Sequence, residues 1–311
     1  MQAEAIVFKN PKQLQLQSLD LRAPGVGELE VDIEFSGIST GTERLLWDGT
    51  MPSFPGMGYP LVPGYESVGR VTRAGDNTTL KAGSRVFVPG AQCFDGVRNL
   101  FGGSASRLVV QEERIVPVED HLGAKAVLLA LAATAQHALA HQAPPDLIIG
   151  HGVMGRLLAR LTVAAGHAAP TVWELNASRQ SGGEGYEVIH PNDDSRRDYR
   201  AIHDVSGDSA ILDKAIARQS PGGEVVLAGF YKDSLSFAFA PAFMRETRIR
   251  IAAQWKREDL SAVTALAHSG KLSLDGLITH AEAPAKAAAA YQTAFGDADC
   301  LKMILDWKHS V

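Results

Sequence analysis

The feature that most constrains the fold of this chain is a glycine pattern near its middle, Gly150-His151-Gly152-Val153-Met154-Gly155. A short apolar run, Leu147 to Ile149, precedes the pattern, and a run with helical spacing, Gly155 to Ala165, follows it. Glycine at these three positions allows a tight turn, close approach of a phosphate to the backbone, and close packing of the helix on the strand. The unpaired N–H groups at the start of such a helix attract anions. We therefore predict a strand–turn–helix unit whose turn, Gly150 to Gly155, binds the pyrophosphate of a dinucleotide.

An acidic residue follows at the distance that such units use for the ribose of the cofactor. Glu174 ends a second apolar run and lies 19 residues after Gly155. A carboxylate about 20 residues past the last glycine accepts hydrogen bonds from the ribose hydroxyls, and it would repel a 2′-phosphate. The sequence therefore favours NAD over NADP, although Arg179 nearby would soften this preference. For His151 two interpretations stay open: a contact with phosphate or protons, and an ordinary solvent-facing loop histidine.

Strand and helix patterns alternate around this unit and predict an α/β fold with a doubly wound parallel sheet. The carboxyl ends of parallel strands face the ligand crevice in such sheets. We therefore expect the loops after the fourth and fifth strands of this domain to border the cofactor. The residues singled out in these loops are Ser206, Gly229 and Phe230.

The first third of the chain has a different sequence pattern, with short β-like runs separated by Gly and Pro turns. Such spacing predicts a small, partly open β-barrel, and 311 residues are enough for two separate cores. We expect a β-rich domain over residues 1–120 and an α/β domain over 121–269, which begins with a helix over 124–141. The tail over 270–311 is expected to rejoin the first domain.

This layout resembles the medium-chain alcohol dehydrogenase superfamily over essentially the whole chain, which implies a GroES-like barrel and a Rossmann domain. Zinc-binding members carry a cysteine in a Gly-Ile-Cys segment and a histidine in a Gly-His-Glu segment, where this chain has Ser39 and Tyr65. Neither a serine hydroxyl nor a phenol is an ordinary zinc ligand, so we expect no catalytic metal. Two alternatives stay open: harmless drift in a non-catalytic loop, and a different metal site that uses Glu66, Cys93 and histidines.

Without a metal, a side chain near the reacting oxygen has to handle the proton of an alcohol during hydride transfer. Tyr65 replaces a metal ligand and is therefore expected to face the nicotinamide. Ser39 and Thr42 can relay a proton, and Glu66 can orient a hydroxyl or accept its proton. We predict that these four side chains form the polar floor of the pocket, with simple packing of Tyr65 as the alternative.

Several longer segments carry a narrower resemblance. They are Gly37 to Glu43, Met51 to Ser67, Phe101 to Gly103, Gly150 to Arg160, Leu227 to Tyr231, Pro241 to Glu246 and Cys300 to Trp307. Together they resemble the family of bacteriochlorophyllide a dehydrogenases. That resemblance implies oxidation of the C3 1-hydroxyethyl group of a chlorophyllide or bacteriochlorophyllide to acetyl, with NAD⁺ as the oxidant, in bacteriochlorophyll a biosynthesis.

A tetrapyrrole is large, flat and mostly apolar, so its site needs aromatic and aliphatic walls. Trp47 lies just before a loop punctuated by Pro and Gly, and Phe54, Met57 and Tyr59 lie on that loop. We predict that these residues cover one face of the macrocycle; the alternative is a loop packed on its own barrel. The basic residues considered for the propionate carboxylate are Arg44, Arg98 and Arg245.

Composition excludes several other partners. The formal net charge of −5 gives no basic surface for nucleic acid, and we expect no stretch of the roughly 20 apolar residues that a membrane span needs. Two cysteines fit a reducing compartment, so a cytoplasmic location is expected, with attachment to the periphery of pigment-synthesising membranes left open. Homodimers are common in the superfamily that the chain resembles.

Two rival functions fit the same fold. A zinc-free quinone or enone reductase would use the same cofactor site, but with a preference for NADPH that Glu174 opposes. A non-catalytic NAD(H)-binding or pigment-binding protein would bind these ligands without hydride transfer, and the hydroxyl-rich pocket argues mildly against it.

Overall fold

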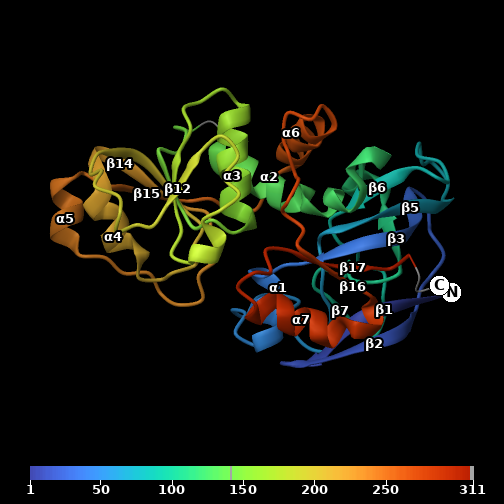
Figure 1. The fold of residues 1–311 in the computed structure, drawn as a ribbon. Helices are drawn as coiled ribbons and strands as arrows, with labels where there is room; N and C mark the ends of the chain where they lie inside the picture. Colours follow the sequence, from blue (N-terminus) through green and yellow to red (C-terminus); the bar gives the residue numbers. More distant parts are fainter. Residues whose placement is uncertain (141, 309–311) are drawn as a thin grey trace. The chain divides into compact units, whose positions relative to one another are not determined.

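The computed structural model describes residues 1–140 and 142–308, and the chain forms two compact units. Unit 1 comprises Met1–Ala130 and Leu277–Val311, and unit 2 comprises Leu131–Gly276 (Figure 1). Each unit has its own buried apolar core. The boundaries lie later in the chain than the expected ones, which followed residues 120 and 269.

Unit 1 is built mainly of β-strands. A four-stranded sheet has the order β2-β1-β4-β7, and a second sheet has the order β16-β17-β3-β5-β6-β9, with β8 also paired to β3. The strands are β1 (Gln2–Asn10), β2 (Gln13–Asp20), β3 (Glu28–Ile38), β4 (Leu61–Val62), β5 (Ser67–Ala74), β6 (Arg85–Val88), β7 (Arg98–Asn99), β8 (Arg107–Gln111), β9 (Val116–Pro117), β16 (His280–Glu282) and β17 (Met303–Asp306). The helices are α1 (Thr42–Asp48), α7 (Ala287–Gly296) and the 3-10 turns η1 (Glu112–Arg114), η2 (Asp120–Leu128) and η4 (Pro284–Lys286).

Strand β3 is the centre of the larger sheet. It pairs antiparallel with β5 on one side and with β8 and β17 on the other, so nearly all of its residues are buried. The pairing with β17 joins Met303 to Ile38 and Asp306 to Phe35. The C-terminal tail therefore belongs to unit 1, and it is drawn beside β3 in Figure 1.

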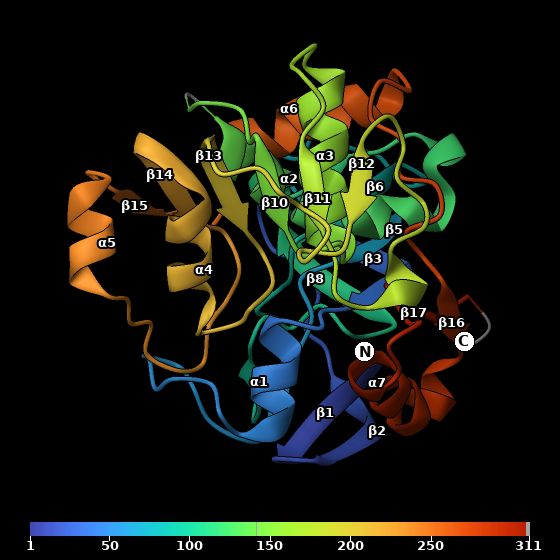
Figure 2. The same cartoon turned by 60° about the vertical axis from the view of Figure 1, so that its left-hand side comes forward.

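Unit 2 is a parallel sheet with helices, and the predicted α/β class is confirmed. Its strand order is β12-β11-β10-β13-β14-β15, the order of a doubly wound dinucleotide-binding sheet. Figure 2 shows helices alongside these strands, with α4 and α5 near β14. The strands are β10 (Leu147–Ile149), β11 (Thr171–Trp173), β12 (Glu187–Ile189), β13 (Tyr199–Asp204), β14 (Gln219–Leu227) and β15 (Arg248–Ile251). The helices are α2 (Leu129–Leu139), α3 (Val153–Ala164), α4 (Ile211–Arg218), α5 (Phe239–Met244), α6 (Arg257–His268) and the 3-10 turn η3 (Ala177–Arg179).

The predicted helix over 124–141 is divided in the structure. A 3-10 segment, Asp120–Leu128, contains Gly123 at a φ of 52° and leads into α2, while residue 141 lies outside the described residues. The combined stretch Asp120–Leu139 is long and apolar enough to cross a membrane, contrary to the expectation from the sequence, and 56% of its apolar 18-residue window is buried inside the fold. A helix buried in the core of a protein can have the same composition, so composition alone does not distinguish a core helix from a membrane span.

Candidate active site and cofactor turn

The predicted glycine turn lies at the carboxyl end of β10 in unit 2. Gly150 has a φ of 103°, in the left-handed region, and a Cβ there would lie 3.2 Å from the Cα of Ser206. A Cβ on Gly155 would overlap the carbonyl oxygen of Gly150. Gly152, in contrast, faces open space and starts α3 without a side-chain cap. The turn therefore leaves room for an anion beside unpaired N–H groups, as a bound pyrophosphate requires.

Glu174 lies directly beside this turn, at the end of β11. Its Oε2 accepts a hydrogen bond from the backbone N–H of His151 at 3.1 Å, and its Oε1 accepts one from the N–H of Asn176 at 2.8 Å. These bonds fix the partly exposed carboxylate next to the glycine turn. A carboxylate in this place fits the acceptor that the ribose hydroxyls of a dinucleotide need.

The side chain of His151 does something that neither sequence interpretation anticipated. The ring is fully buried. Its Nδ1 donates to the carbonyl oxygen of Arg179 at 2.6 Å, and its Nε2 accepts from the hydroxyl of Tyr186 at 2.9 Å. Burial lowers the pKa of His151 to about 4, so the ring is neutral at pH 7. The interpretation as a solvent-facing histidine is therefore wrong, and the contact with phosphate or protons stays a prediction; the ring ties the loop after β11 to the start of α3.

The loops after β13 and β14 lie at the same edge of the sheet. Ser206 donates its backbone N–H to Asp204 at 3.1 Å, and Gly229 donates to the carbonyl of Asp204 at the same distance. The hydroxyl of Tyr231 is bonded to the buried carboxylate of Asp204, and Phe230 is exposed. The sequence marked both loops but not the Asp204–Tyr231 pair that joins them.

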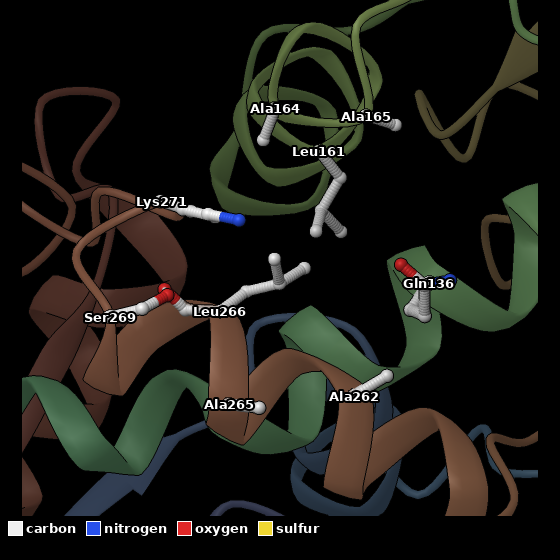
Figure 3. A pocket seen from close by; sticks show the side chains of 9 residues that line it. All are labelled: Gln136, Leu161, Ala164, Ala165, Ala262, Ala265, Leu266, Ser269 and Lys271. Carbon is white, nitrogen blue, oxygen red and sulfur yellow. The ribbon is translucent and has the colours of Figure 1, made fainter.

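A hollow of about 450 Å³ lies elsewhere in unit 2, among α2, α3 and α6 (Figure 3). Its part of α3 is the C-terminal end, opposite the glycine turn. Alanine and leucine side chains form most of its wall, and no predicted site residue is among them. The lining residues are Gln136, Leu161, Ala164, Ala165, Ala262, Ala265, Leu266, Ser269 and Lys271.

Unit 1 brings two of the predicted catalytic hydroxyls together. Ser39 follows β3 and Tyr65 precedes β5, and the register that pairs Ser36 with Ser67 places the two neighbouring ends side by side. The Ser39 Oγ and the Tyr65 Oη are 2.6 Å apart. The side chain of Thr42, at the start of α1, also hydrogen bonds with Tyr65. Three of the four predicted catalytic residues thus share one hydrogen-bonded group.

The electrostatic surroundings keep Tyr65 protonated. Burial raises the pKa of the Tyr65 phenol well above its ordinary value of 10, and the negative charge of Glu66 raises it further. The phenol therefore holds its proton at neutral pH. It is suited to donate and pass on protons, and less suited to hold negative charge.

Glu66 has a partner that the sequence did not suggest. It is fully buried and forms an ion pair with the ammonium group of Lys302, which is 1% exposed. The Nζ of Lys302 also donates to the carbonyl oxygen of Ile38 at 3.0 Å. The only available sign in the sequence was a lysine inside the apolar stretch Cys300 to Leu305. A glycine at position 37 makes room, because a Cβ there would overlap Glu66 and touch the Lys302 Cε at 3.0 Å.

A second buried carboxyl group, Glu43, lies near this pair. Its Oε2 accepts from the hydroxyl of Tyr291 at 2.7 Å, and its Oε1 accepts from the backbone N–H of Ser39 at 3.3 Å. Burial, aided by the charge of Glu66, raises the pKa of Glu43 to about 7. Glu66 is thus the carboxyl group paired with the ammonium group, and near neutral pH Glu43 exists in both protonation states.

The residues of this site do not favour a divalent metal. Among residues 1–140 and 142–308, no three His, Cys, Asp or Glu side chains gather as metal ligands would. Cys93 is packed in the apolar core of unit 1. The ammonium group of Lys302 against Glu66 would repel a second cation. The alternative metal site around Glu66 and Cys93 therefore finds no support in these contacts.

The predicted substrate loop lies largely against its own domain. Trp47, Met57 and Tyr59 pack on the core of unit 1, and the Tyr59 hydroxyl is bonded to the carbonyl of Leu46. Phe54 is 38% exposed. An aromatic residue outside the prediction, Phe101, is 37% exposed and packs edge-on against Tyr65, with ring centroids 5.4 Å apart. Phe54 and Phe101 are thus the exposed aromatic rings of this group, while the other three predicted residues are occupied by packing.

The three arginines considered for the propionate carboxylate are divided between the two units. Arg44 lies 3.8 Å from Asp48 on α1, and Arg98 is on β7 in the same unit. Arg245 belongs to unit 2, where it donates to the carbonyl of Gln219 at 3.2 Å.

Comparison with known proteins agrees with this geometry. Residues 25–120 match the alcohol dehydrogenase GroES-like domain. The 2-desacetyl-2-hydroxyethyl bacteriochlorophyllide A dehydrogenases of Rhodobacter capsulatus and Cereibacter sphaeroides are 57% and 54% identical to the chain, over 99% of this chain and of each relative. A solved 2R,3R-butanediol dehydrogenase from Bacillus subtilis has the same fold, with a TM-score of 0.84 at 20% identity, covering 98% of this chain and 99% of that one. The chain therefore belongs to the 2-desacetyl-2-hydroxyethyl bacteriochlorophyllide A dehydrogenase family, within the medium-chain dehydrogenase superfamily.

Proposed function

We propose that the chain oxidises the 1-hydroxyethyl substituent of a chlorophyllide or bacteriochlorophyllide to acetyl, with NAD⁺ as hydride acceptor. The observation that carries this proposal is the hydroxyl pair of Ser39 and Tyr65, 2.6 Å apart, at the two places where zinc-binding members have metal ligands. The names of the two closely similar relatives supply the substrate class.

The cofactor assignment is supported by the turn in unit 2. Nicotinamide, when bound, supplies the two-electron acceptor for the hydride. Gly152 and the start of α3 would hold the pyrophosphate, and Glu174 would accept the ribose hydroxyls. Because a 2′-phosphate would meet the negative charge of Glu174, we propose NAD and not NADP.

The proton of the alcohol would leave through the hydrogen-bonded hydroxyls of Tyr65, Ser39 and Thr42 in unit 1. Tyr65 holds its own proton, so it would pass protons on to its hydrogen-bonded partner and not store negative charge. Ser39 and Thr42 are the partners available to it, and because these hydroxyls only relay the proton, it would finally be released to water. Glu66 would act through its charge, because its carboxylate is paired with Lys302. Phe101 and Phe54 would supply apolar contact area for the macrocycle.

The test is turnover of purified protein with NAD⁺ and a hydroxyethyl-bearing chlorin, followed through NADH formation and the absorbance of the acetyl product. Tyr65→Phe and Ser39→Ala should each lower kcat by about 10²- to 10⁴-fold, the range for loss of a proton-transfer group. NAD⁺ binding should be unchanged, because the cofactor turn belongs to unit 2.

Tyr199→Phe is the matched control, because it removes another buried phenol hydroxyl, one bonded to Asp194 in unit 2. It should leave kcat unchanged. Full activity of Tyr65→Phe would remove this residue from the mechanism. Reduction of enones with NADPH, without alcohol oxidation, would favour the quinone or enone reductase, and binding of both ligands without turnover would favour a carrier protein.

A homodimer is the second part of the proposal. Strand β15 lies at one end of the sheet in unit 2, and its outer edge is unpaired among the described residues. Apolar side chains on β15 and on α5 are exposed, among them Ile251 at 75% and Phe243 at 65%. An unpaired edge with exposed apolar side chains invites another strand. A second copy of this chain, related by a two-fold axis, would cover both features at once.

A further inference from the structure

Lys302 stands apart from the residues that the proposed function uses. It contacts neither Ser39 nor Tyr65 through its ammonium group, yet it reaches the neighbour of each. Its Nζ donates to the carbonyl of Ile38, which directly precedes Ser39, and pairs with the carboxylate of Glu66, which directly follows Tyr65. We propose that Lys302 is a positioning residue, which fixes the Ser39–Tyr65 hydroxyl pair by bridging the two chain segments that carry it. This inference rests on the proposed function.

The burial of Lys302 argues for such a role. An ammonium group that is 1% exposed loses nearly all of its hydration, and the attraction of its partner offsets that loss only when the geometry is good. An apolar pair of similar size is often as stable as a buried ion pair, or more so. Stability therefore gives a weak reason for a lysine here, whereas a directional bridge between two segments requires one.

The surroundings are shaped to admit this bridge. Position 37 has no side chain, and a Cβ there would collide with Glu66 and press on the stem of Lys302. The backbone N–H of Gly37 donates to the carbonyl of Glu66 at 2.8 Å, so the two segments are also joined directly beside the ion pair. Lys302 itself comes from the tail, immediately before β17, whose first residue pairs with Ile38.

Loss of the bridge should disturb the hydroxyl pair in a defined way. Without Lys302, the carbonyl of Ile38 loses its donor, and Glu66 is left as an unpaired buried charge or takes up a proton. The segments that end in Ser39 and begin at Tyr65 then lose the group that both of them bind. A displacement of about 1 Å at a reacting group can lower a rate by roughly 10²-fold.

The first test measures turnover in three variants. Lys302→Met should lower kcat by about 30- to 100-fold, with the KM for NAD⁺ unchanged. Lys302→Arg, which keeps the charge, should retain more activity than Lys302→Met. The double variant K302M/E66Q removes both charges, so that no unpaired buried charge is left to unfold the protein. If K302M/E66Q is folded and as active as wild type, the proposal is overturned.

A matched control separates positioning from stability. Arg85 is another buried cation of unit 1, paired with Glu34 at 2.8 Å. Arg85→Met should lower the melting temperature while leaving kcat of the folded protein unchanged. Equal losses of kcat in Arg85→Met and Lys302→Met would overturn the specific role of Lys302.

A double-mutant cycle then asks whether Lys302 acts through Tyr65. If it does, Lys302→Met in a Tyr65→Phe background should lower kcat less than about 2-fold further, because the group that it positions is already gone. If the kcat of the double variant falls by the product of the two single losses, Lys302 and Tyr65 act independently and the proposal is overturned.

The last readout needs neither cofactor nor pigment. With the six tyrosines isotope-labelled, the ring signal of Tyr65 is identified in NMR spectra by its disappearance in Tyr65→Phe. This signal should shift in Lys302→Met and stay in place in Arg85→Met. An unmoved signal in Lys302→Met would overturn the proposal. Failure of wild type to oxidise the chlorin would overturn the proposed function and leave this test of Lys302 standing.

Discussion

At the scale of single residues, Gly37 is the most informative position in this protein, because it lacks a side chain beside a buried ion pair. Its φ does not require glycine, but its surroundings do, because the ion pair of Glu66 and Lys302 occupies the space that a side chain would take. The glycine, the acid and the lysine therefore form one structural unit. The absence of a side chain at Gly37 leaves the space in which Glu66 and Lys302 form their ion pair.

Gly37→Ala is accordingly expected to be costly. The added methyl group would overpack the ion pair and lower the free energy of unfolding by about 1–3 kcal/mol, together with kcat, because the displaced groups flank the hydroxyl pair. Urea unfolding and steady-state turnover measure the two effects. Gly41→Ala is the control in the same segment, since nothing lies within 4 Å of its Cβ position. A fully stable and active Gly37→Ala protein would contradict this account.

At the scale of elements, the strand–turn–helix unit of β10 and α3 is held by more than its glycines. The ring of His151 accepts from Tyr186 and donates to Arg179, and the guanidinium of Arg156 on α3 donates to the carbonyls of Arg179, Ser181 and Gly182. The loop after β11 is therefore fastened to the start of α3. That loop begins directly after Glu174, so the fastening also places the carboxylate beside the turn.

This fastening gives a pH dependence of stability. Burial lowers the pKa of His151, and likewise that of the buried His203, from 6.5 to about 4. The neutral rings are favoured in the folded state, so the unfolded chain binds protons first as the pH falls. The stabilisation is therefore complete above pH 6.5 and is lost as the pH falls from 6.5 to about 4, on the order of 1–3 kcal/mol for each histidine.

Urea unfolding across this pH window measures the loss. His151→Gln should lose less stability than wild type as the pH falls from 6.5 to 4, while the contribution of His203 and the opposite one of Glu43, whose pKa is raised to about 7, remain in both proteins. His121→Gln is the control, since this histidine is largely exposed on unit 1, and it should retain the wild-type dependence. An identical slope in His151→Gln and wild type would rule out His151 as a source.

At the scale of the whole molecule, the exposed edge of unit 2 bears on assembly. The proposed dimer would cover β15 and α5, whose apolar side chains are otherwise in water. Ile251 is the last residue of β15, and a lysine there would put a charge in place of the exposed apolar side chain and add to the charges of Arg248 and Arg250, which opposes strand pairing. Ile251→Lys should therefore convert a dimer into monomers, as measured by sedimentation or light scattering.

Val26→Lys provides the comparison, because Val26 is also a highly exposed apolar residue but lies in unit 1, between β2 and β3. This variant should assemble as wild type does. A monomeric wild-type protein, or an Ile251→Lys protein that remains dimeric, would show that this edge is not the interface.

The sequence alone determined the local features whose cause is local. The spacing of Gly150, Gly152 and Gly155 between an apolar strand and a helix dictated the turn, since each glycine answers a steric demand within a few residues. Alternation of strand and helix determined the α/β class. The replacement of metal-ligand positions by Ser39 and Tyr65 marked the candidate site, and the structure does bring these two hydroxyls together.

Tertiary structure alone decided which distant side chains share a site. Lys302 lies 264 residues from the carbonyl of Ile38 that it binds, and Tyr291 lies 248 residues from Glu43. No periodicity in the chain encodes such pairings, because they arise when the tail pairs with β3. The same holds for His151, Trp47 and Tyr59, whose burial depends on neighbours remote in sequence. Local sequence sets the conformation of the backbone, whereas burial, partners and charge are set by what the fold brings alongside.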